Sequence, residues 1–421
     1  TYNTAVGYSA GDHITTGVQN AIIGALAGDA LTDADRNAVF GYSALTLDTL
    51  GSKSTAIGAI TLANQNFTTA TDSFNTAVGY AAGQEVTTGI QNTLVGALTG
   101  DALTTGKEHV AVGYEALSTE TNAHASTAIG YQALKAQNGS GAINTLNVAV
   151  GIQAGLDVTT GVQNTLIGAL AGSNLTDADF NVSLGYHALS TDTLGSRSTA
   201  IGTEALFTQN FTTATNTYNV AVGYQTGVLL TTGVQNTLIG ALAGAAITTA
   251  ESNVGVGYQA LMDTTTGGDN TAVGELALSN NTTGIRNVAV GSSALFTKTT
   301  GNDNVAIGTS SLYATTTASD NIAVGTGALE TNTTGASNVA IGRNALQANT
   351  TGTNGVAIGY QASLLNTTGG QNTSMGWNAF GTNTTGSDNT ALGKRALHAS
   401  TTASFNTSVG SNSLFLNTTG A

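Results

Sequence analysis

Residues 338–354 read NVAIGRNALQANTTGTN, and this 17-residue repeat returns along the whole 421-residue chain. A glycine preceded by an apolar residue marks each of 24 repeats, from Gly7 to Gly410, and the spacing is uniform except at three places that carry a four-residue insertion. A fixed short period indicates a solenoid, in which one structural unit stacks on its neighbours. We therefore expect one long stack instead of the two or three globular domains that the length alone suggests.

Each repeat carries a strand signal just before its glycine. The residue before the glycine is apolar in all 24 repeats, and the residue two before the glycine is usually alanine. This short run, dominated by β-branched residues, predicts a strand of about five residues. We expect one face of the strand to cover its own coil and the alanine-lined face to meet a partner chain. The trimer-facing candidates are Ala5, Ala77, Ala149, Ala221, Ala289, Ala306 and Ala340.

Asparagine stands four residues before the glycine in 19 of the 24 repeats. In a parallel stack identical side chains recur at ~4.8 Å, so their amides can hydrogen-bond in a ladder. The alternative is that asparagine serves only turn chemistry. The predicted structural ladder contains Asn3, Asn20, Asn37, Asn75, Asn92, Asn147, Asn164, Asn219, Asn236, Asn287 and Asn304.

A Thr-Thr-Gly element, as in residues 15–17 and 87–89, lies roughly opposite the strand in each repeat. We expect it at an outer corner, where a positive φ is least costly for glycine. Two strands per repeat, joined by tight turns, would make each repeat one rung of an all-β parallel β-solenoid (β-roll). About 24 rungs at ~4.8 Å each would span on the order of 115 Å.

The three insertions follow Gly58, Gly130 and Gly202 and define a 72-residue super-repeat. Residues 1–218 therefore read as three four-rung blocks with four-residue insertions, and residues 219–421 as a plainer continuation. Both ends lie within a repeat, so we expect a segment of a longer chain. Insertions in repeat proteins often mark a binding face, although extra loop is also tolerated as decoration. The candidate binding loops contain Phe67, Asn138 and Phe211.

The composition limits the classes of function. Only 8% of residues are charged and 5% are aromatic, so the core must be narrow and filled by Ala, Val and Ile. The absence of cysteine excludes a disulfide framework and cysteine-based metal sites. The net charge of −14 disfavours binding to nucleic acid. The longest weakly polar run, residues 238–247, is half of the ~20 residues that a membrane span needs, so we expect no membrane insertion.

Several motifs resemble catalytic or metal-binding sequences without their context. Residues 7–11, GYSAG, match a nucleophile elbow, but no helical pattern follows and later blocks carry Ala or Gln in place of Ser9. Asp33 and Asp35 recur as Asp177 and Asp179, yet the intervening block lacks them, which favours a turn over a calcium site. The five histidines form no ligand-spaced pair. We therefore predict no enzyme activity, no cofactor and no metal.

Tyrosines follow the glycine in many repeats and should form an irregular column. Such a column can bind glycans on the outside of a rod, and it can also shield the edge of a thin core, which is the more common role. The column contains Tyr8, Tyr42, Tyr80, Tyr114, Tyr131, Tyr186, Tyr224, Tyr258 and Tyr360.

The strings at residues 3–7 (NTAVG), 198–202 (STAIG) and 304–308 (NVAIG) resemble the head repeats of trimeric autotransporter adhesins. The longer string at residues 338–352 is similar to repeats of phage tail fibres and bacterial surface proteins. The resemblance covers the whole chain. It implies a left-handed parallel β-roll and a homotrimer with three chains packed side by side, although the adhesin repeat is shorter than the repeat of this chain.

Three functions follow as hypotheses. The first is the shaft of a phage tail fibre or similar virion appendage, which holds a receptor-binding tip for host attachment. The second is a bacterial cell-surface trimeric adhesin whose repeats bind matrix, host glycans or another receptor. The third is an extracellular β-solenoid that polymerises end to end. The expected location is accordingly the virion surface, the cell surface or the extracellular space.

Overall fold

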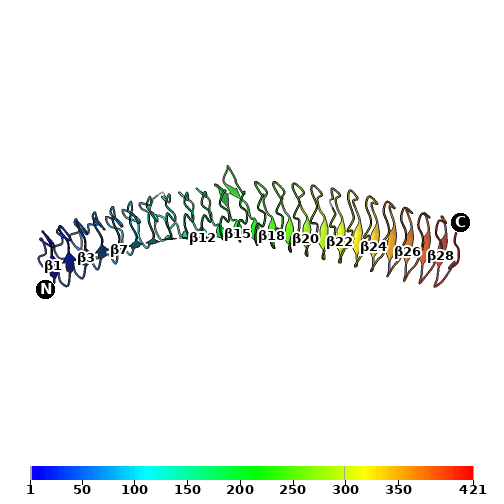
Figure 1. Ribbon diagram of the computed structural model, residues 1–421, viewed down its shortest axis with the longest axis horizontal. Helices are drawn as coiled ribbons and strands as arrows, with labels where there is room; N and C mark the ends of the chain where they lie inside the picture. Colours follow the sequence, from blue (N-terminus) through cyan, green and yellow to red (C-terminus); the bar gives the residue numbers. More distant parts are fainter. Residues whose placement is uncertain (1, 140, 298, 421) are drawn as a thin grey trace. The chain divides into compact units, whose positions relative to one another are not determined.

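The computed structural model describes residues 2–139, 141–297 and 299–420. The chain is an all-β parallel β-solenoid of about 24 turns at 17-residue spacing, and the described residues contain no helix. It divides into two compact units, Thr1–Thr217 (unit 1) and Tyr218–Ala421 (unit 2). Within each unit the strands follow one another in chain order (Figure 1). The division lies one residue before the end of the third sequence block.

The strands of unit 1 are short and separated by bends and turns. They are β1 (Thr4–Val6), β2 (Ala21–Ile23), β3 (Ala38–Phe40), β4 (Gly51–Ser52), β5 (Thr55–Ile57), β6 (Thr71–Asp72), β7 (Thr76–Val78), β8 (Thr93–Val95), β9 (Val110–Val112), β10 (Thr127–Ile129), β11 (Val148–Val150), β12 (Thr165–Ile167), β13 (Val182–Leu184), β14 (Gly195–Ser196), β15 (Thr199–Ile201) and β16 (Thr215–Asn216).

Unit 2 repeats one strand per turn without the additional short pairs. Its strands are β17 (Val220–Val222), β18 (Thr237–Ile239), β19 (Val254–Val256), β20 (Thr271–Val273), β21 (Val288–Val290), β22 (Val305–Ile307), β23 (Ile322–Val324), β24 (Val339–Ile341), β25 (Val356–Ile358), β26 (Thr373–Met375), β27 (Thr390–Leu392) and β28 (Thr407–Val409).

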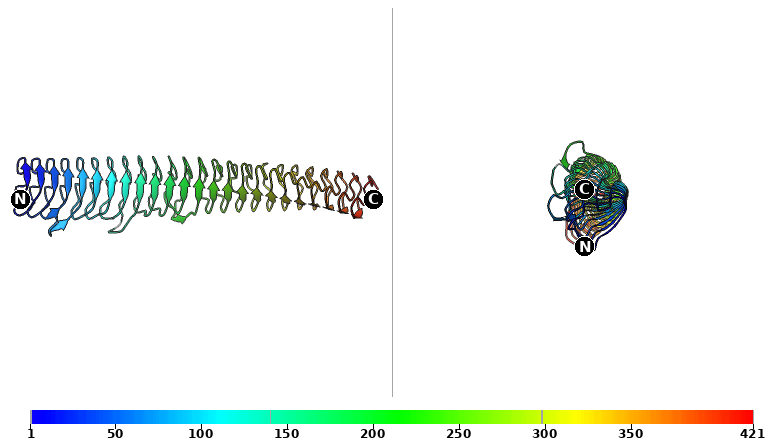
Figure 2. Two further views of the ribbon diagram at one scale, coloured as in Figure 1. Left: turned by 90° about the horizontal axis from the view of Figure 1, so that it is seen from below. Right: turned by 90° about the vertical axis from the view of Figure 1, so that its left-hand side faces the viewer.

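The strands pair in parallel and in register with the next turn. In β7 and β8, Ala77 lies opposite Leu94, which is the same position of the following repeat. Between β5 and β7, Ala56 lies opposite Ala77, although the first insertion separates the two residues. The four extra residues are therefore looped out and the register of the sheet is kept. Figure 2 shows the insertion segments projecting from one side of unit 1.

The strand before each glycine is three residues long, which corrects the expectation of about five, and apart from the short strands β4, β6, β14 and β16 each described turn has one strand instead of two. The Thr-Thr-Gly side still bonds between turns: Thr87 N donates to Thr104 O at 2.9 Å. Contrary to our expectation, the glycine of this element does not need a positive φ. A Cβ at Gly89 would lie 2.3 Å from Gly106 O, so close approach of the next turn explains this glycine.

The glycine after the strand has a different role. In 24 repeats, from Gly7 to Gly410, its φ lies between 122° and 146°. A Cβ at Gly79 would also lie 2.3 Å from Gly96 O in the next turn. An L-residue is therefore excluded both by conformation and by space, which explains the fixed glycine of the sequence.

The core is a narrow column filled by two positions of each turn. One is the centre of the strand, and the other is the residue four after the glycine, which has a left-handed backbone. Ala56 is accompanied by Leu62, whereas Leu94 is accompanied by Gly100, and all four lie in the interior. A Cβ at Gly100 would lie 2.9 Å from Leu94 Cδ2. In these two turns the smaller residue of one position accompanies the larger residue of the other, and in turns with Gly at the second position a further apolar residue three positions on, such as Leu103, is also buried.

Candidate interaction surface

The alanines predicted to face a partner chain lie inside their own coil. Six of the seven are fully buried, and Ala5 in the first turn is exposed. In a three-residue strand the side chain of the central residue points opposite to its two neighbours. Because the central residue of the strand packs in the core of its own coil, the two flanking residues point outward. The expectation of an alanine-lined contact face is therefore wrong. The buried members are Ala77, Ala149, Ala221, Ala289, Ala306 and Ala340.

The outward face of each strand is instead an aliphatic stripe, made by the residue before the glycine. In the described turns this residue is half-buried or exposed, for example Ile307 at 39% and Ile341 at 40% exposure. The first residue of the strand adds to the stripe where it is Val or Ile, as at Val254 and Ile322. An apolar stripe repeated in every turn is a candidate interaction surface.

The tyrosines continue this apolar surface past the glycine. All nine tyrosines of the predicted column are exposed. Tyr114 and Tyr131, on successive turns, stack with ring centroids 5.7 Å apart. Their rings lie outside the core, and their open faces are available to a ligand.

The asparagines before the strand form a hydrogen-bonded column. Asn20 N donates to Asn3 Oδ1 at 2.9 Å, and Asn20 Nδ2 donates to Ala34 O at 2.7 Å. The same pair of bonds recurs at Asn92, Asn164, Asn236 and Asn304, and these asparagines are buried. Each amide thus donates to the backbone carbonyl 14 residues further on and accepts from the backbone N–H 17 residues further on, which favours the ladder over the turn-only interpretation.

Other residues replace asparagine in this column and keep one of its bonds. Ser54 N donates to Asn37 Oδ1 at 2.8 Å, and Gly355 N donates to Asn338 Oδ1 at 2.8 Å. His109 is buried, with Nε2 at 2.7 Å from Ala123 O, and its Nδ1 accepts from Ser126 N at 3.2 Å. Burial lowers the pKa of His109 and favours this neutral form.

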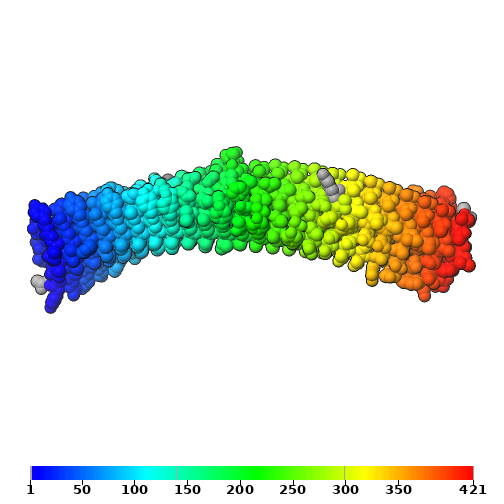
Figure 3. Space-filling model, in the orientation of Figure 1, coloured from blue at the N-terminus to red at the C-terminus, as the bar shows by residue number. Residues whose placement is uncertain are grey.

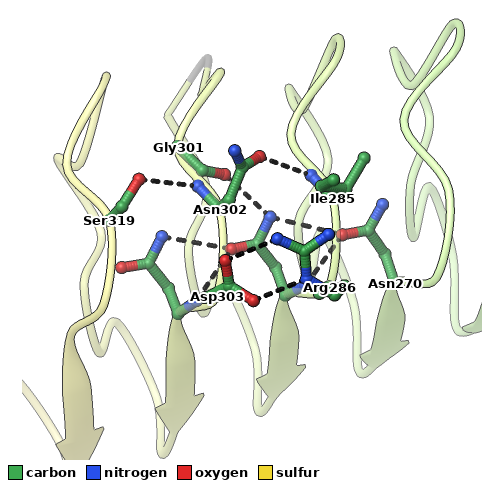
Figure 4. A network of polar contacts seen from close by, with 9 residues as sticks. Asn270, Ile285, Arg286, Gly301, Asn302, Asp303 and Ser319 are labelled. Carbon is green, nitrogen blue, oxygen red and sulfur yellow. Dashed lines mark hydrogen bonds and ion pairs between the residues drawn. The ribbon is translucent and has the colours of Figure 1, made fainter.

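Figure 4 shows how three polar columns run side by side in unit 2. Below the surface, Asn287 N donates to Asn270 Oδ1 at 3.0 Å. Beside it, Ile285 N donates to Asn302 Oδ1 at 2.9 Å. At the surface, Arg286 and Asp303 form a bidentate ion pair with bonds of 2.7 and 2.8 Å. The ion pair is exposed, so it contributes little beside the buried amides.

A second asparagine column was missed by the sequence analysis. Where the corner reads Asn-Thr-Thr-Gly, the asparagine is buried and bonds to its own corner and to the previous turn. Asn349 Nδ2 donates to Gly352 O at 3.0 Å and to Asn332 Oδ1 at 2.9 Å. The signal for this column is the fixed position of the asparagine directly before the Thr-Thr-Gly corner.

A buried carboxylate and a glutamine hold each insertion loop of unit 1 in place through hydrogen bonds. Asp48 Oδ1 accepts from Gly51 N at 3.0 Å and from Phe67 N at 3.1 Å, and Asp48 Oδ2 accepts from Gln65 Nε2 at 2.6 Å. Gln65 Oε1 in turn accepts from Asn75 Nδ2 at 2.9 Å. The network therefore joins the loop to the asparagine column.

The same network returns in the other two blocks. Asp192 with Gln209 repeats it at 2.6 Å, and Glu120 with Gln137 repeats it at 3.1 Å. All three carboxylates are buried, and burial raises the pKa of Asp48. Because these groups lie inside the protein and bond to backbone N–H groups, their chemistry is structural.

The predicted loop residues differ in exposure. Phe67 and Phe211 are buried at 5% and 6%, so they anchor their loops and do not present a binding surface, which corrects the expectation for these two residues. Asn138 is exposed. The short pairs β4–β6 and β14–β16 stiffen the loops that contain the phenylalanines. In the space-filling view the segment around β16 stands out from its surroundings (Figure 3).

A pocket of about 370 Å³ lies in unit 1 between His13, Asp29 and Leu47. His13 Nδ1 lies 2.7 Å from Asp29 O. The equivalent of His13 is Glu85 in the second block and Asp157 in the third, so the pocket chemistry is not repeated.

In residues 2–139, 141–297 and 299–420, no three His, Asp or Glu side chains gather in a metal-binding group. Within the same ranges Ser9 bonds to neither a histidine nor a carboxylate, and no helix is long and apolar enough to cross a membrane. No family model and no curated protein matches the chain.

Proposed function

We propose that the chain forms the shaft of a homotrimeric fibre, a phage tail fibre or similar virion appendage that holds a receptor-binding tip away from the particle. The single observation that carries this proposal is the aliphatic stripe. Within each unit, one outward apolar residue in each turn gives a continuous surface that a parallel copy of the same chain, aligned turn by turn, would cover. The resemblance of the NVAIG strings to trimeric adhesin heads supports three chains and a left-handed coil.

The energetics support assembly along the whole stripe. Burying one half-exposed Val or Ile stabilises a contact by about 1 kcal/mol. A single turn would therefore associate weakly, whereas many turns in register would associate strongly. The scarcity of charge on the stripe keeps the desolvation cost low.

The test is the mass of the chain in solution, measured by light scattering over a range of concentrations. We expect three times 41.8 kDa. A mass of 41.8 kDa at all concentrations would contradict the trimer, and with it this form of the shaft. Electron micrographs of the same sample should show unbranched particles of uniform width.

A bacterial surface adhesin is the second candidate, and the exposed tyrosine column favours it. The stacked pair Tyr114 and Tyr131 offers flat aromatic faces of the kind that bind sugars. In this case immobilised matrix proteins or glycans should retain the protein, and replacing both tyrosines with alanine should abolish retention without changing the mass.

A further inference from the structure

The last turns of unit 2 carry cations and aromatic rings in one column. Arg343, Tyr360, Trp377 and Lys394 occupy the same position of four successive repeats and lie two residues after the strands β24 to β27. All four are exposed. Backbone bonds hold the column in register, because Gln361 N, Asn378 N and Arg395 N donate to the carbonyls of the preceding members at 2.9–3.0 Å.

Lys394 of this column and the neighbouring Arg395 make cation–π contacts with aromatic rings. Lys394 Nζ lies 5.3 Å from the Trp377 ring centroid, and Arg395 Cζ lies 5.1 Å from the same ring. Arg395 Cζ also lies 5.5 Å from the ring of Phe415. Such contacts orient a cation without neutralising it.

No carboxylate compensates these charges. Within the described residues none of Arg343, Lys394 and Arg395 forms an ion pair, and Arg395 Nε has no hydrogen-bond partner. Residues 331–421 contain one acidic residue, Asp388, although the whole chain has a net charge of −14. The column is therefore a local basic site on an acidic protein.

We infer that this column binds an acidic saccharide, a sugar chain that carries carboxylates. The exposed rings of Trp377 and Tyr360 can stack against sugar rings, and Arg395, whose Nε is buried, can bind a carboxylate through the N–H groups of its two terminal nitrogens. The distance from Arg343 to Lys394 spans three turns, on the order of 14 Å, which suits a short oligosaccharide. This inference goes beyond the shaft function and requires that the column stays exposed in the assembled protein.

Binding can be followed by the intrinsic fluorescence of Trp377, because it is the only tryptophan of the chain. The experiment titrates the full chain with trigalacturonic acid and follows tryptophan emission. Maltotriose is the neutral sugar control, and hexaglutamate is the anion control without a sugar ring. We expect a saturable change with trigalacturonic acid and none with either control. An equal response to maltotriose or hexaglutamate, or no saturable response, would overturn the inference.

Matched variants locate the site. Replacing Lys394 and Arg395 together with glutamine should weaken binding at least tenfold. Arg36→Gln, which removes an exposed cation in unit 1, should leave binding unchanged. Circular dichroism of each variant checks the fold. Equal binding by both variants, or a Trp377 that acrylamide cannot quench because a partner chain covers it, would also overturn the inference. The solution mass is measured separately, so failure of the shaft proposal remains distinguishable.

Discussion

Two residues per turn determine the interior of this solenoid. The left-handed position four after the glycine and the position three residues later exchange volume: Gly83 occurs with the buried Val86, whereas Leu62 occurs with the polar Gln65. A leucine with positive φ costs about 1 kcal/mol in backbone strain. Burial of its side chain offsets this cost, since a fully buried leucine contributes about 2 kcal/mol. The strain is therefore tolerated where the leucine side chain fills the core.

The glycine after the strand should tolerate no side chain. We expect Gly96→Ala to destabilise unit 1 by at least about 3 kcal/mol, because φ is 139° and the new Cβ would meet Gly113 O at 2.4 Å. Gly141→Ala is the matched control, with φ of 89° and no atom within 4 Å of a Cβ. It should cost about 1 kcal/mol. Denaturant unfolding compares the two variants, and equal costs would contradict the close-approach explanation.

Asp48 should make unit 1 more stable in mild acid than at neutral pH. Its pKa is raised by burial, so the folded protein binds a proton more readily than the unfolded chain does. This contribution is fully present below the ordinary aspartate pKa and is lost as the pH rises through the folded value.

Asp48→Asn provides the reference for this prediction. Between about pH 7 and about pH 4 the unfolding free energy of the wild type should rise relative to that of the variant. Hydrogen exchange of the amides of Gly51 and Phe67, which bond to Asp48, reports the effect locally. Parallel pH curves for the two proteins would show that Asp48 is not the responsible group.

At the scale of the element, the sequence predicts the repeat but not the direction of its side chains. The period, the strand position and the first asparagine column follow from the 17-residue spacing. In the pattern Thr-Ala-Val, the side chain of the central residue points to one face of the strand and the side chains of its two neighbours point to the other face. The pattern does not show which of these two faces is buried. The residue four after the glycine does not resolve this ambiguity, because Ala56 occurs with Leu62 whereas Ala77 occurs with Gly83.

The buried acid–glutamine networks could not be predicted in the same way. Asp48 and Gln65 lie one turn apart and stand at a position that holds Ile14 and Leu31 in the preceding turns. From the sequence alone, a charged residue at this apolar position is interpreted as a turn residue, because the sequence does not show the loop that the residue binds. The three networks close the gaps that the insertions would otherwise open in the core.

The asparagine column should contribute to stability at each of its members. Asn304 bonds to Asn287 Oδ1, to Ala318 O and, through its own Oδ1, to Asn321 N, with distances of 2.9–3.1 Å. Asn304→Ala leaves buried backbone groups unpaired and should cost on the order of 2 kcal/mol or more. Thr334→Ala, at an exposed corner, should change the unfolding free energy by less than about 0.5 kcal/mol. Similar effects of the two variants would contradict a structural role for the column.

At the scale of the whole molecule, each turn contacts mainly its neighbours. Stability is then close to a sum of turn and interface contributions. A defect inside one turn should therefore act on folding, whereas a change on the outward stripe should act on association. This separation makes the proposed assembly testable with substitutions at adjacent residues.

Two sets of variants place glutamate on opposite sides of the same strands. Ile307, Ile341 and Met375 lie on the outward stripe, and we expect their joint replacement to give a folded chain of monomeric mass, because like charges would meet between copies. Ala306 and Ala340 are fully buried, so their replacement should instead unfold the surrounding turns. Light scattering gives the mass, and circular dichroism gives the fold. If the stripe variant remains trimeric, the copies meet through another surface. If the alanine variant remains folded, the inward placement of the alanines is wrong.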